Sequence, residues 1–334
     1  CSSRRRHTRS SVESRGLGDV YKRQAYARDA GRWLDPRLRE PVLQLVDAEG
    51  FARSDDWCPG ADLPVPADVL ATLARPVEDA NIDLRLREIV GRCSEGAELA
   101  EADIERLFQA RGPELAWLCR QADALRAERH GPAVSYVVNR NINYTNICYF
   151  KCQFCAFSKG KLSENLRGKP YDLDHAEIAR RSSEAWERGA TEVCMQGGIH
   201  PDYTGQTYLD IVAEVKAAAP GLHVHAFSPL EVWQGAHTLG LELEDYLRAL
   251  KEAGLNTLPG TAAEILDDEV RALICPDKID TGQWLEVMET AHRLGFRTTA
   301  TIMYGHLEQP RHWARHLLRL RELQQRSGGF TEFV

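Results

Sequence analysis

The 334-residue sequence contains no long hydrophobic run. No apolar stretch approaches the ~18 consecutive residues that a membrane-spanning helix requires. The chain also lacks the positive charge of a general nucleic-acid-binding protein, because its formal net charge is −7. These two absences predict a soluble, cytoplasmic protein that has neither a membrane nor a nucleic acid as its partner.

A regular cysteine framework is also absent. Of the nine cysteines, six are scattered along the chain, unlike the even pattern of a small disulfide-rich secreted domain. The other three, Cys148, Cys152 and Cys155, lie within eight positions in "NRNINYTNICYFKCQFCAFSKGK". In a reducing cytoplasm, we expect thiols clustered in this way to be ligands rather than bridges.

Three clustered thiols are compatible with a disulfide knot, a zinc knuckle, an electron-transfer cluster, or a cluster that does chemistry. A structural zinc site needs a fourth ligand, which Cys194 or His200 could supply, but such sites usually pair ligands across two knuckles. An electron carrier would also need a fourth thiolate. In a cluster of four irons, three thiolates leave one iron open to a small chelating ligand. The spacing therefore favours an open iron–sulfur cluster, with zinc and unligated thiols as alternatives.

The composition changes along the chain. Residues 1–24 are rich in Arg and Ser and are similar to translated sequencing-adapter sequence, so we expect them to be non-native. Residues 25–76 combine a short helical pattern with Pro, Gly and Asp, which predicts the tail of an upstream unit plus a linker.

Residues 77–130 predict a helical lead-in with helices at 80–93, at 101–110, and from Pro113 onward, where proline suits the first helical position. We expect the last of these helices to bury one stripe. That stripe contains Leu115, Leu118, Ala122 and Leu125.

Residues 131–334 alternate short apolar runs with amphipathic helical patterns, which is typical of β/α units on a parallel sheet. The expected strands are 133–139, 192–196, 222–227, 257–258, 298–303 and 330–334. The predicted fold class is α/β, a partial (β/α)6 TIM-type barrel preceded by a small helical segment. Because no helical pattern follows the last strand, we expect the barrel to be truncated at its C-terminal end.

Alternation along two strands predicts a polar lumen. The strand face that packs on helices must be apolar, so polar side chains point inward or lie at the rim. This places His225 and Phe227 inside on the third strand, and Cys194 and Gln196 inside on the second. A purely structural barrel would avoid such polar groups. The cysteines follow the first strand, at the rim where barrels of this kind build active sites.

The cysteine spacing, with Phe154 directly before Cys155, resembles the motif of the radical S-adenosylmethionine (SAM) enzymes. Together with "MQGGIHPD", "HAFSPLEV", "LPGTAAEILDDEVR" and "ICPDKI", residues from about 101 to 334 resemble the second module of the FO synthases. Residues 25–76 resemble the end of the first module. The resemblance implies a [4Fe-4S] cluster held by Cys148, Cys152 and Cys155, SAM as the second cofactor, a first module in the same natural chain, and a low-potential electron donor.

The implied reaction joins the 4-hydroxybenzyl fragment of L-tyrosine to 5-amino-6-(D-ribitylamino)uracil in deazaflavin coenzyme biosynthesis. SAM, reduced at the cluster, would supply the radical. A menaquinone-pathway radical SAM enzyme, of the aminofutalosine synthase or dehypoxanthine futalosine cyclase type, has similar motifs and is the nearest alternative. A zinc-stabilised binding module is the alternative from a different class.

The resemblance and the rim positions also predict further site residues. We expect Phe154 to pack near adenine and the Gln196, Gly197 and Gly198 turn to accept the SAM amino group, although Gly-Gly also suits an ordinary turn. The remaining predicted cofactor contacts are Ser228, Glu231, Thr261 and Glu264, and the predicted catalytic residues are His225, Tyr304 and His306. Capping of the next helix is an equal alternative for Ser228 and Glu231, and core, turn or cap roles are alternatives for the others.

Overall fold

The computed structural model describes residues 30–46, 64–74, 81–155, 158 and 170–334. The chain divides into two compact units, residues 1–66 with 159–170, and residues 67–158 with 171–334. The first unit contains α2 (Ala30–Trp33) and α3 (Pro36–Gln44), and Asp35 caps α3 by accepting a hydrogen bond from Arg37 N at 2.9 Å. The segment 1–24, predicted to be non-native, lies outside the described residues.

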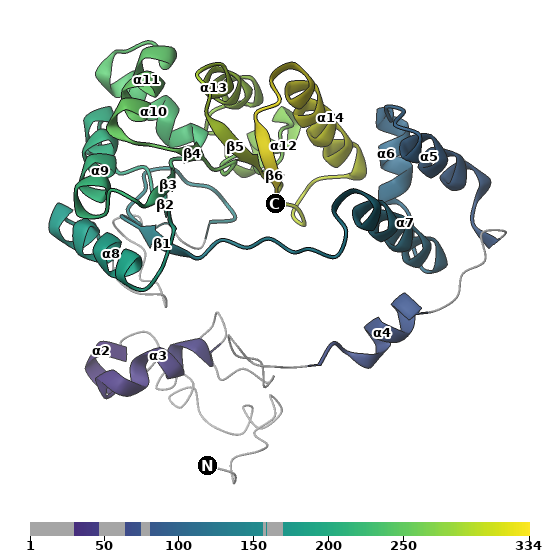
Figure 1. Ribbon diagram of the computed structural model, residues 1–334, viewed down its shortest axis with the longest axis horizontal. Coiled ribbons are helices and arrows are strands. Elements are labelled where there is room, and N and C mark those ends of the chain that lie inside the picture. The colour runs from purple at the N-terminus through teal and green to yellow at the C-terminus, as the bar shows by residue number, and fades with distance from the viewer. Residues whose placement is uncertain (1–29, 47–63, 75–80, 156–157, 159–169) are drawn as a thin grey trace, which may run out of the picture. The chain divides into compact units, whose positions relative to one another are not determined.

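The second unit is built on six parallel strands whose order in the sheet follows their order in the sequence. This order confirms the predicted partial barrel, and Figure 1 shows the helices around the outer side of the strands. The strands are β1 (Asn139–Asn143), β2 (Glu192–Gln196), β3 (His223–Ala226), β4 (Thr257–Leu258), β5 (Arg297–Ala300) and β6 (Phe330–Phe333).

The connecting helices begin at residues that satisfy their free backbone N–H groups. Asp174 accepts from Glu177 N at 2.8 Å at the start of α8, and Asp280 accepts from Gln283 N at 2.8 Å at the start of α13. The helices are α8 (His175–Glu187), α9 (Gly205–Ala218), α10 (Pro229–Leu239), α11 (Leu243–Ala253), α12 (Asp268–Ile274), α13 (Thr281–Arg293) and α14 (Pro310–Ser327). No helix of the described part of the chain has the length and apolar character that a bilayer crossing requires.

The main core lies between the strands and these helices. Val193, Met195, Val224 and Ala226, the apolar residues that alternate with the predicted inward side chains of β2 and β3, are fully buried in it. Their neighbours on β2 and β3, Glu192, Cys194, Gln196, His223 and His225, are only partly buried. The predicted apolar outside and polar lumen are therefore confirmed for these two strands.

The prediction for the first strand was wrong. The run 133–138 contains no strand, and Val134 and Tyr136 in it are 87% and 85% exposed. The strand is instead the polar sequence Asn139–Asn143, in which Ile142 alone is buried. Backbone pairing with β2 and one apolar side chain are sufficient here, because one face of a barrel strand lines a polar lumen.

Phe227 was also placed on the wrong face. Its backbone has a left-handed φ of 64°, which breaks the alternation of β3. The ring therefore packs in the core, with its centroid 5.0 Å from that of Tyr208 and 6.2 Å from that of Tyr144.

The helical lead-in contains α5 (Leu84–Ser94), α6 (Glu101–Phe108) and α7 (Pro113–His130), and α4 (Ala67–Ala74) precedes it. The first predicted helix begins four residues later than expected. The predicted stripe on α7 was wrong, because Ala116 and Trp117 are its buried residues and Leu115 is 47% exposed. Of the predicted stripe, Leu118 packs against the small core, whereas Ala122 is exposed.

Polar contacts attach this lead-in to the far end of the barrel. Arg315 Nε on α14 lies 3.0 Å from Glu101 Oε1 on α6, and Arg321 Nη1 donates to Leu99 O at 2.8 Å. The rings of Phe108 and Trp313 meet edge to face with centroids 5.0 Å apart. Figure 1 shows α6 and α14 side by side.

Candidate active site

A cavity of about 210 Å³ lies at the carboxyl ends of the strands and contains all three clustered cysteines in its wall. Every residue predicted to bind the metal cluster or SAM lines it. These residues are Cys148, Cys152, Cys155, Phe154, Gln196, Gly197, Gly198, Ser228, Glu231, Thr261 and Glu264, and Phe150, Ser158, Ile199, Leu230, Ala262 and Lys278 complete the wall. The fold thus gathers side chains from the loops after β1, β2, β3 and β4 in one place.

Backbone hydrogen bonds fix the cysteine loop on two sides. Tyr149 N donates to Ile199 O, after β2, at 3.1 Å, and Gln153 N donates to Ile274 O, at the end of α12, at 3.0 Å. Within the loop, Cys155 N donates to Cys152 O at 3.2 Å. The three thiols are therefore held by the barrel scaffold rather than by a free-standing loop.

The two glycines after β2 are required by contacts with the protein itself. A Cβ at Gly197 would overlap the ring of Tyr144, with Tyr144 Cζ at 2.7 Å. A Cβ at Gly198 would overlap the carbonyl oxygen of Ile147 and lie 2.9 Å from Cys148 Cβ. Glycine therefore brings the end of β2 against the first cysteine.

We expect Gly198→Ala to lose most of its ability to hold iron, because the Ile147 and Cys148 backbone would have to move out of position. The measurement is iron and acid-labile sulfide per chain after anaerobic reconstitution. Gly91→Ala in α5 is the matched control, since nothing lies within 4 Å of its Cβ position. Normal iron content in Gly198→Ala would show that the Cys148 position tolerates the displacement.

Glu231 organises the turn between the strand ends. The residue is 1% exposed, and its carboxylate accepts hydrogen bonds from Gly197 N at 3.1 Å, from Ser228 N at 2.6 Å and from the Tyr144 hydroxyl. Ser228 Oγ in turn accepts from Glu231 N at 3.3 Å, so the two residues form the capping box of α10. Burial raises the pKa of Glu231, against the hydrogen bonds that it accepts. The capping alternative is therefore confirmed, although both residues also line the cavity.

The cavity wall also contains a buried ion pair and two residues with a left-handed backbone. Lys278 Nζ lies 2.5 Å from Glu264 Oε1, and both side chains are nearly buried. Burial would lower the pKa of Lys278, but the carboxylate of Glu264 outweighs it and the pKa is raised. Ala262 and Glu264 have φ values of 65° and 46°, which cost free energy in residues other than glycine and are typical of functional sites.

Comparison with known proteins identifies the family. The model of the Radical SAM superfamily matches residues 142–320. FO synthase of Streptomyces coelicolor is 42% identical over 347 residues, covering 92% of this chain and 40% of that protein. The 5-amino-6-(D-ribitylamino)uracil–L-tyrosine 4-hydroxyphenyl transferase of Methanocaldococcus jannaschii is 51% identical over 220 residues, covering 65% of this chain and 60% of that protein.

The chain belongs to the radical SAM superfamily. It spans about two fifths of the length of the FO synthase that it matches. Solved structures with the same fold include HydG, a maturase of the [FeFe]-hydrogenase, with a TM-score of 0.56 at 15% identity over 75% of this chain and 53% of HydG. Methylornithine synthase (PylB) has a TM-score of 0.53 at 20% identity over 74% of this chain and 68% of that protein.

Membership of the radical SAM superfamily implies a [4Fe-4S] cluster and SAM as cofactors, and the cavity fits both. Its wall offers three thiols and no fourth cysteine among the described residues, so one iron would have no protein ligand. Burial raises the pKa of the Cys152 thiol to about 11, and metal binding would convert it to the thiolate. The hydroxyl oxygen of Thr261 is buried and has no hydrogen-bond partner in the described part of the chain, as expected where a polar ligand binds.

The zinc alternative has no support in this radical SAM site. Cys194 lies on β2 and His200 stacks on Tyr203, with ring centroids 4.9 Å apart, and neither residue lines the cavity with the three cysteines. Cys275 is 2% exposed, as expected for a small buried residue.

The three predicted catalytic residues do not line the cavity. His225 lies deeper in the lumen, with Nδ1 2.8 Å from Thr257 Oγ1, and burial lowers its pKa to about 4, so its imidazole is neutral near pH 7. Tyr304 is 70% exposed, which does not support a role inside the site. Alternation placed His225 in the lumen and loop position placed Tyr304 and His306 at the rim, but strand depth and loop direction decide which side chains reach the cavity.

His306 lies beside the cavity and stacks on Phe154, with centroids 6.2 Å apart. Its Nδ1 is 2.7 Å from Glu308 Oε2, although the ring is not aligned for a hydrogen bond. Burial opposes ionisation of Glu308, but hydrogen bonds from Gly305 N and His306 N outweigh it and lower its pKa to about 2. Because His306 lies next to an ionised carboxylate at the edge of the site, it stays a predicted functional residue.

Sequence reasoning missed three residues that build the site. Lys278 lies in "ICPDKI" and Arg271 in "LDDEVR", so both were within the motifs that carry the resemblance. Arg271 is 3% exposed and donates to Ala263 O at 2.5 Å and to Ile279 O. Tyr144 is fully buried beneath Gly197. Their position within those motifs was the signal that could have indicated Lys278 and Arg271.

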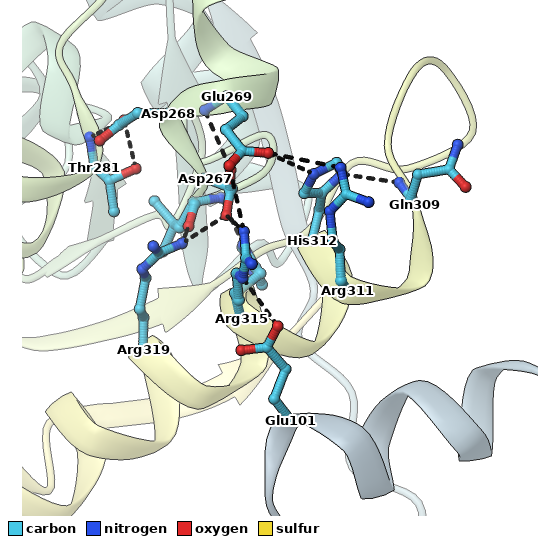
Figure 2. Close-up of polar contacts among 12 residues, drawn as sticks. Glu101, Asp267, Asp268, Glu269, Thr281, Gln309, Arg311, His312, Arg315 and Arg319 are labelled. Atoms are coloured by element: carbon cyan, nitrogen blue, oxygen red, sulfur yellow. Dashed lines mark hydrogen bonds and ion pairs between the residues drawn. The ribbon is translucent and has the colours of Figure 1, made fainter.

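A second group of potential metal ligands lies away from the cysteines. Asp267, Glu269 and His312 bring one ligand atom each within 4.8 Å of one another. Figure 2 shows two guanidinium groups turned toward Asp267, and Arg315 Nη1 and Arg319 Nη1 are each 3.4 Å from its Oδ2. These cations already balance the carboxylate charge.

The imidazole of His312 is also occupied. Its Nδ1 accepts from Gln309 N at 2.9 Å, so Nε2 carries the proton, and Nε2 lies 3.3 Å from Glu269 Oε2 (Figure 2). We therefore interpret this group as an ion-pair network that joins α12 to α14.

Proposed function

We propose that the chain is the 4-hydroxyphenyl transferase part of an FO synthase, which joins the 4-hydroxybenzyl fragment of L-tyrosine to 5-amino-6-(D-ribitylamino)uracil. The single observation that carries this proposal is the cavity in which the cysteine loop, the Gly-Gly turn and the Glu264 wall come together. The 51% identity to a transferase of that name supports the substrate pair.

The residues of the site have distinct tasks in this proposal. Cys148, Cys152 and Cys155 would hold the iron, and the buried Thr261 hydroxyl would bind a polar group of SAM. When bound, the cluster and SAM supply radical chemistry through a one-electron reduction of SAM. The apolar parts of the wall, Phe150 and Leu230, exclude water, which would otherwise compete with the substrates.

The domain assignment belongs to the same proposal. Residues 25–76 are the end of a first module plus a linker, residues 77–130 are a helical lead-in, and residues 131–334 are the radical SAM barrel. A match over 92% of the chain extends into the residues before the lead-in, which supports continuity with a first FO synthase module. A low-potential electron donor would serve the cluster.

The test is a reaction of the full chain, reconstituted anaerobically with iron and sulfide, with dithionite and SAM. We expect 5'-deoxyadenosine to form faster with L-tyrosine and the ribitylaminouracil together than with either alone, and a product containing both substrates by mass spectrometry. Formation of 5'-deoxyadenosine that is indifferent to both substrates would contradict the substrate assignment and favour another radical SAM reaction.

A further inference from the structure

The buried ion pair of Glu264 and Lys278 lies in the same cavity wall as the three cysteines. Their side chains are 11% and 12% exposed, and the charged atoms are 2.5 Å apart. Lys278 Nζ also lies 5.5 Å from the ring centroid of Phe154, which is the neighbour of Cys155 in the cysteine loop. A full positive charge is thus held next to the metal-binding loop.

The scaffold holds this charge at a constant distance from the loop. The end of α12 holds both the cysteine loop and Lys278 through backbone hydrogen bonds. Ile274 O accepts from Gln153 N at 3.0 Å, and Cys275 O accepts from Lys278 N at 3.1 Å. On the other side, Glu264 O accepts from Met303 N at 2.9 Å and holds the left-handed turn that directs the carboxylate to Lys278.

Fold stability does not explain the pair. Burying two charges costs about as much free energy as their attraction returns, and well-packed apolar residues of similar volume are often as stable. Backbone strain at Glu264 adds to that cost. A pair maintained at such a cost beside a metal site is expected to act through its electric field.

We propose that Lys278 raises the reduction potential of the iron–sulfur cluster held by Cys148, Cys152 and Cys155, and that Glu264 moderates this effect by neutralising part of the lysine's charge. Reduction of the cluster by one electron adds one negative charge, which a cation nearby stabilises. The interaction is strong because the site is buried and its effective dielectric constant is far below that of water. The inference rests on the cluster of the proposed function, but not on the identity of the substrates.

Substitutions at the two residues should shift the midpoint potential of the cluster in opposite directions. Lys278→Met removes the cation and leaves a carboxylate, so the midpoint potential should become more negative, whereas Lys278→Arg should stay near wild type. Glu264→Gln leaves the lysine without its counter-ion, so the potential should become more positive. Lys216→Met is the matched control, because Lys216 donates to Leu222 O just before β3, at the opposite end of the strands.

The experiment is a redox titration of the reconstituted full chains, followed by electron paramagnetic resonance without SAM or substrates, with iron and sulfide measured in each variant. Unchanged potentials in both Lys278→Met and Glu264→Gln, or shifts of the same sign, would overturn the inference. If Lys278→Met holds no iron, Glu264→Gln decides alone: a positive shift supports the inference and no shift overturns it.

The result separates this inference from the proposed function. A wild-type chain that forms no cluster would overturn both. If the wild type and the variants have equal midpoint potentials and the wild type still shows substrate-stimulated 5'-deoxyadenosine formation, the role of Lys278 alone is overturned.

Discussion

Replacing Cys152 with alanine should reduce the iron retained after reconstitution by more than about tenfold, because loss of a residue that only supports a metal ligand already costs 10 to 100-fold in affinity. Cys152 occupies the middle of the cysteine loop and packs against two apolar clusters. No described side chain near it offers a replacement thiolate except buried Cys275. Iron and sulfide analysis and the visible spectrum of the chain measure the effect.

Two cysteines outside the cavity wall serve as controls for this prediction. Cys194→Ala changes a half-buried lumen thiol and Cys119→Ala an exposed one, and both should bind iron as the wild type does. Cys152→Ala/Cys275→Ala tests whether Cys275 replaces the lost ligand. Full iron content in that double variant would contradict the three-cysteine site.

Arg271→Met should destabilise the barrel by about 3 kcal/mol or more, because each buried acceptor left without a donor costs about 1–3 kcal/mol. The guanidinium of Arg271 donates to Ala262 O at 3.3 Å, to Ala263 O at 2.5 Å and to Ile279 O, all in the wall of the site or next to it. The methionine fills similar volume but donates to none of them. Urea unfolding monitored by circular dichroism gives the change in the free energy of unfolding.

An exposed arginine provides the comparison for Arg271. Arg326 pairs with Glu289 at 3.1 Å on the surface of α14, where such ion pairs contribute about 0–1 kcal/mol. Arg326→Met should therefore leave stability within about 1 kcal/mol of the wild type. Similar losses in the two variants would show that the carbonyls around Arg271 find other partners, and would remove its role in holding the Ala262 to Glu264 turn.

Local patterns were sufficient for much of the site. Capping residues, the Gly-Gly turn and the cysteine spacing each depend on a few neighbouring positions, and Ser228, Gly197 and Cys152, which these patterns indicated, line one cavity. The predicted alternation of inward and outward side chains on β2 and β3 was also correct, because successive side chains of a strand point to opposite faces. The alternation failed at Phe227, where a left-handed backbone turns the side chain to the other face.

The sequence by itself determined that this chain forms parallel β/α units, that three thiols without a fourth partner follow the first strand, and that polar groups enter the lumen. These features depend on period, spacing and composition, which are local. The tertiary structure alone decided that Lys278 and Glu264 meet beside the cysteines, that Arg271 supports their wall, and that Tyr304 is largely exposed. These contacts join residues 8 to 14 positions apart. They form only when the loops after β4 and α12 fold against each other in the assembled barrel, because a charge buried there requires a partner.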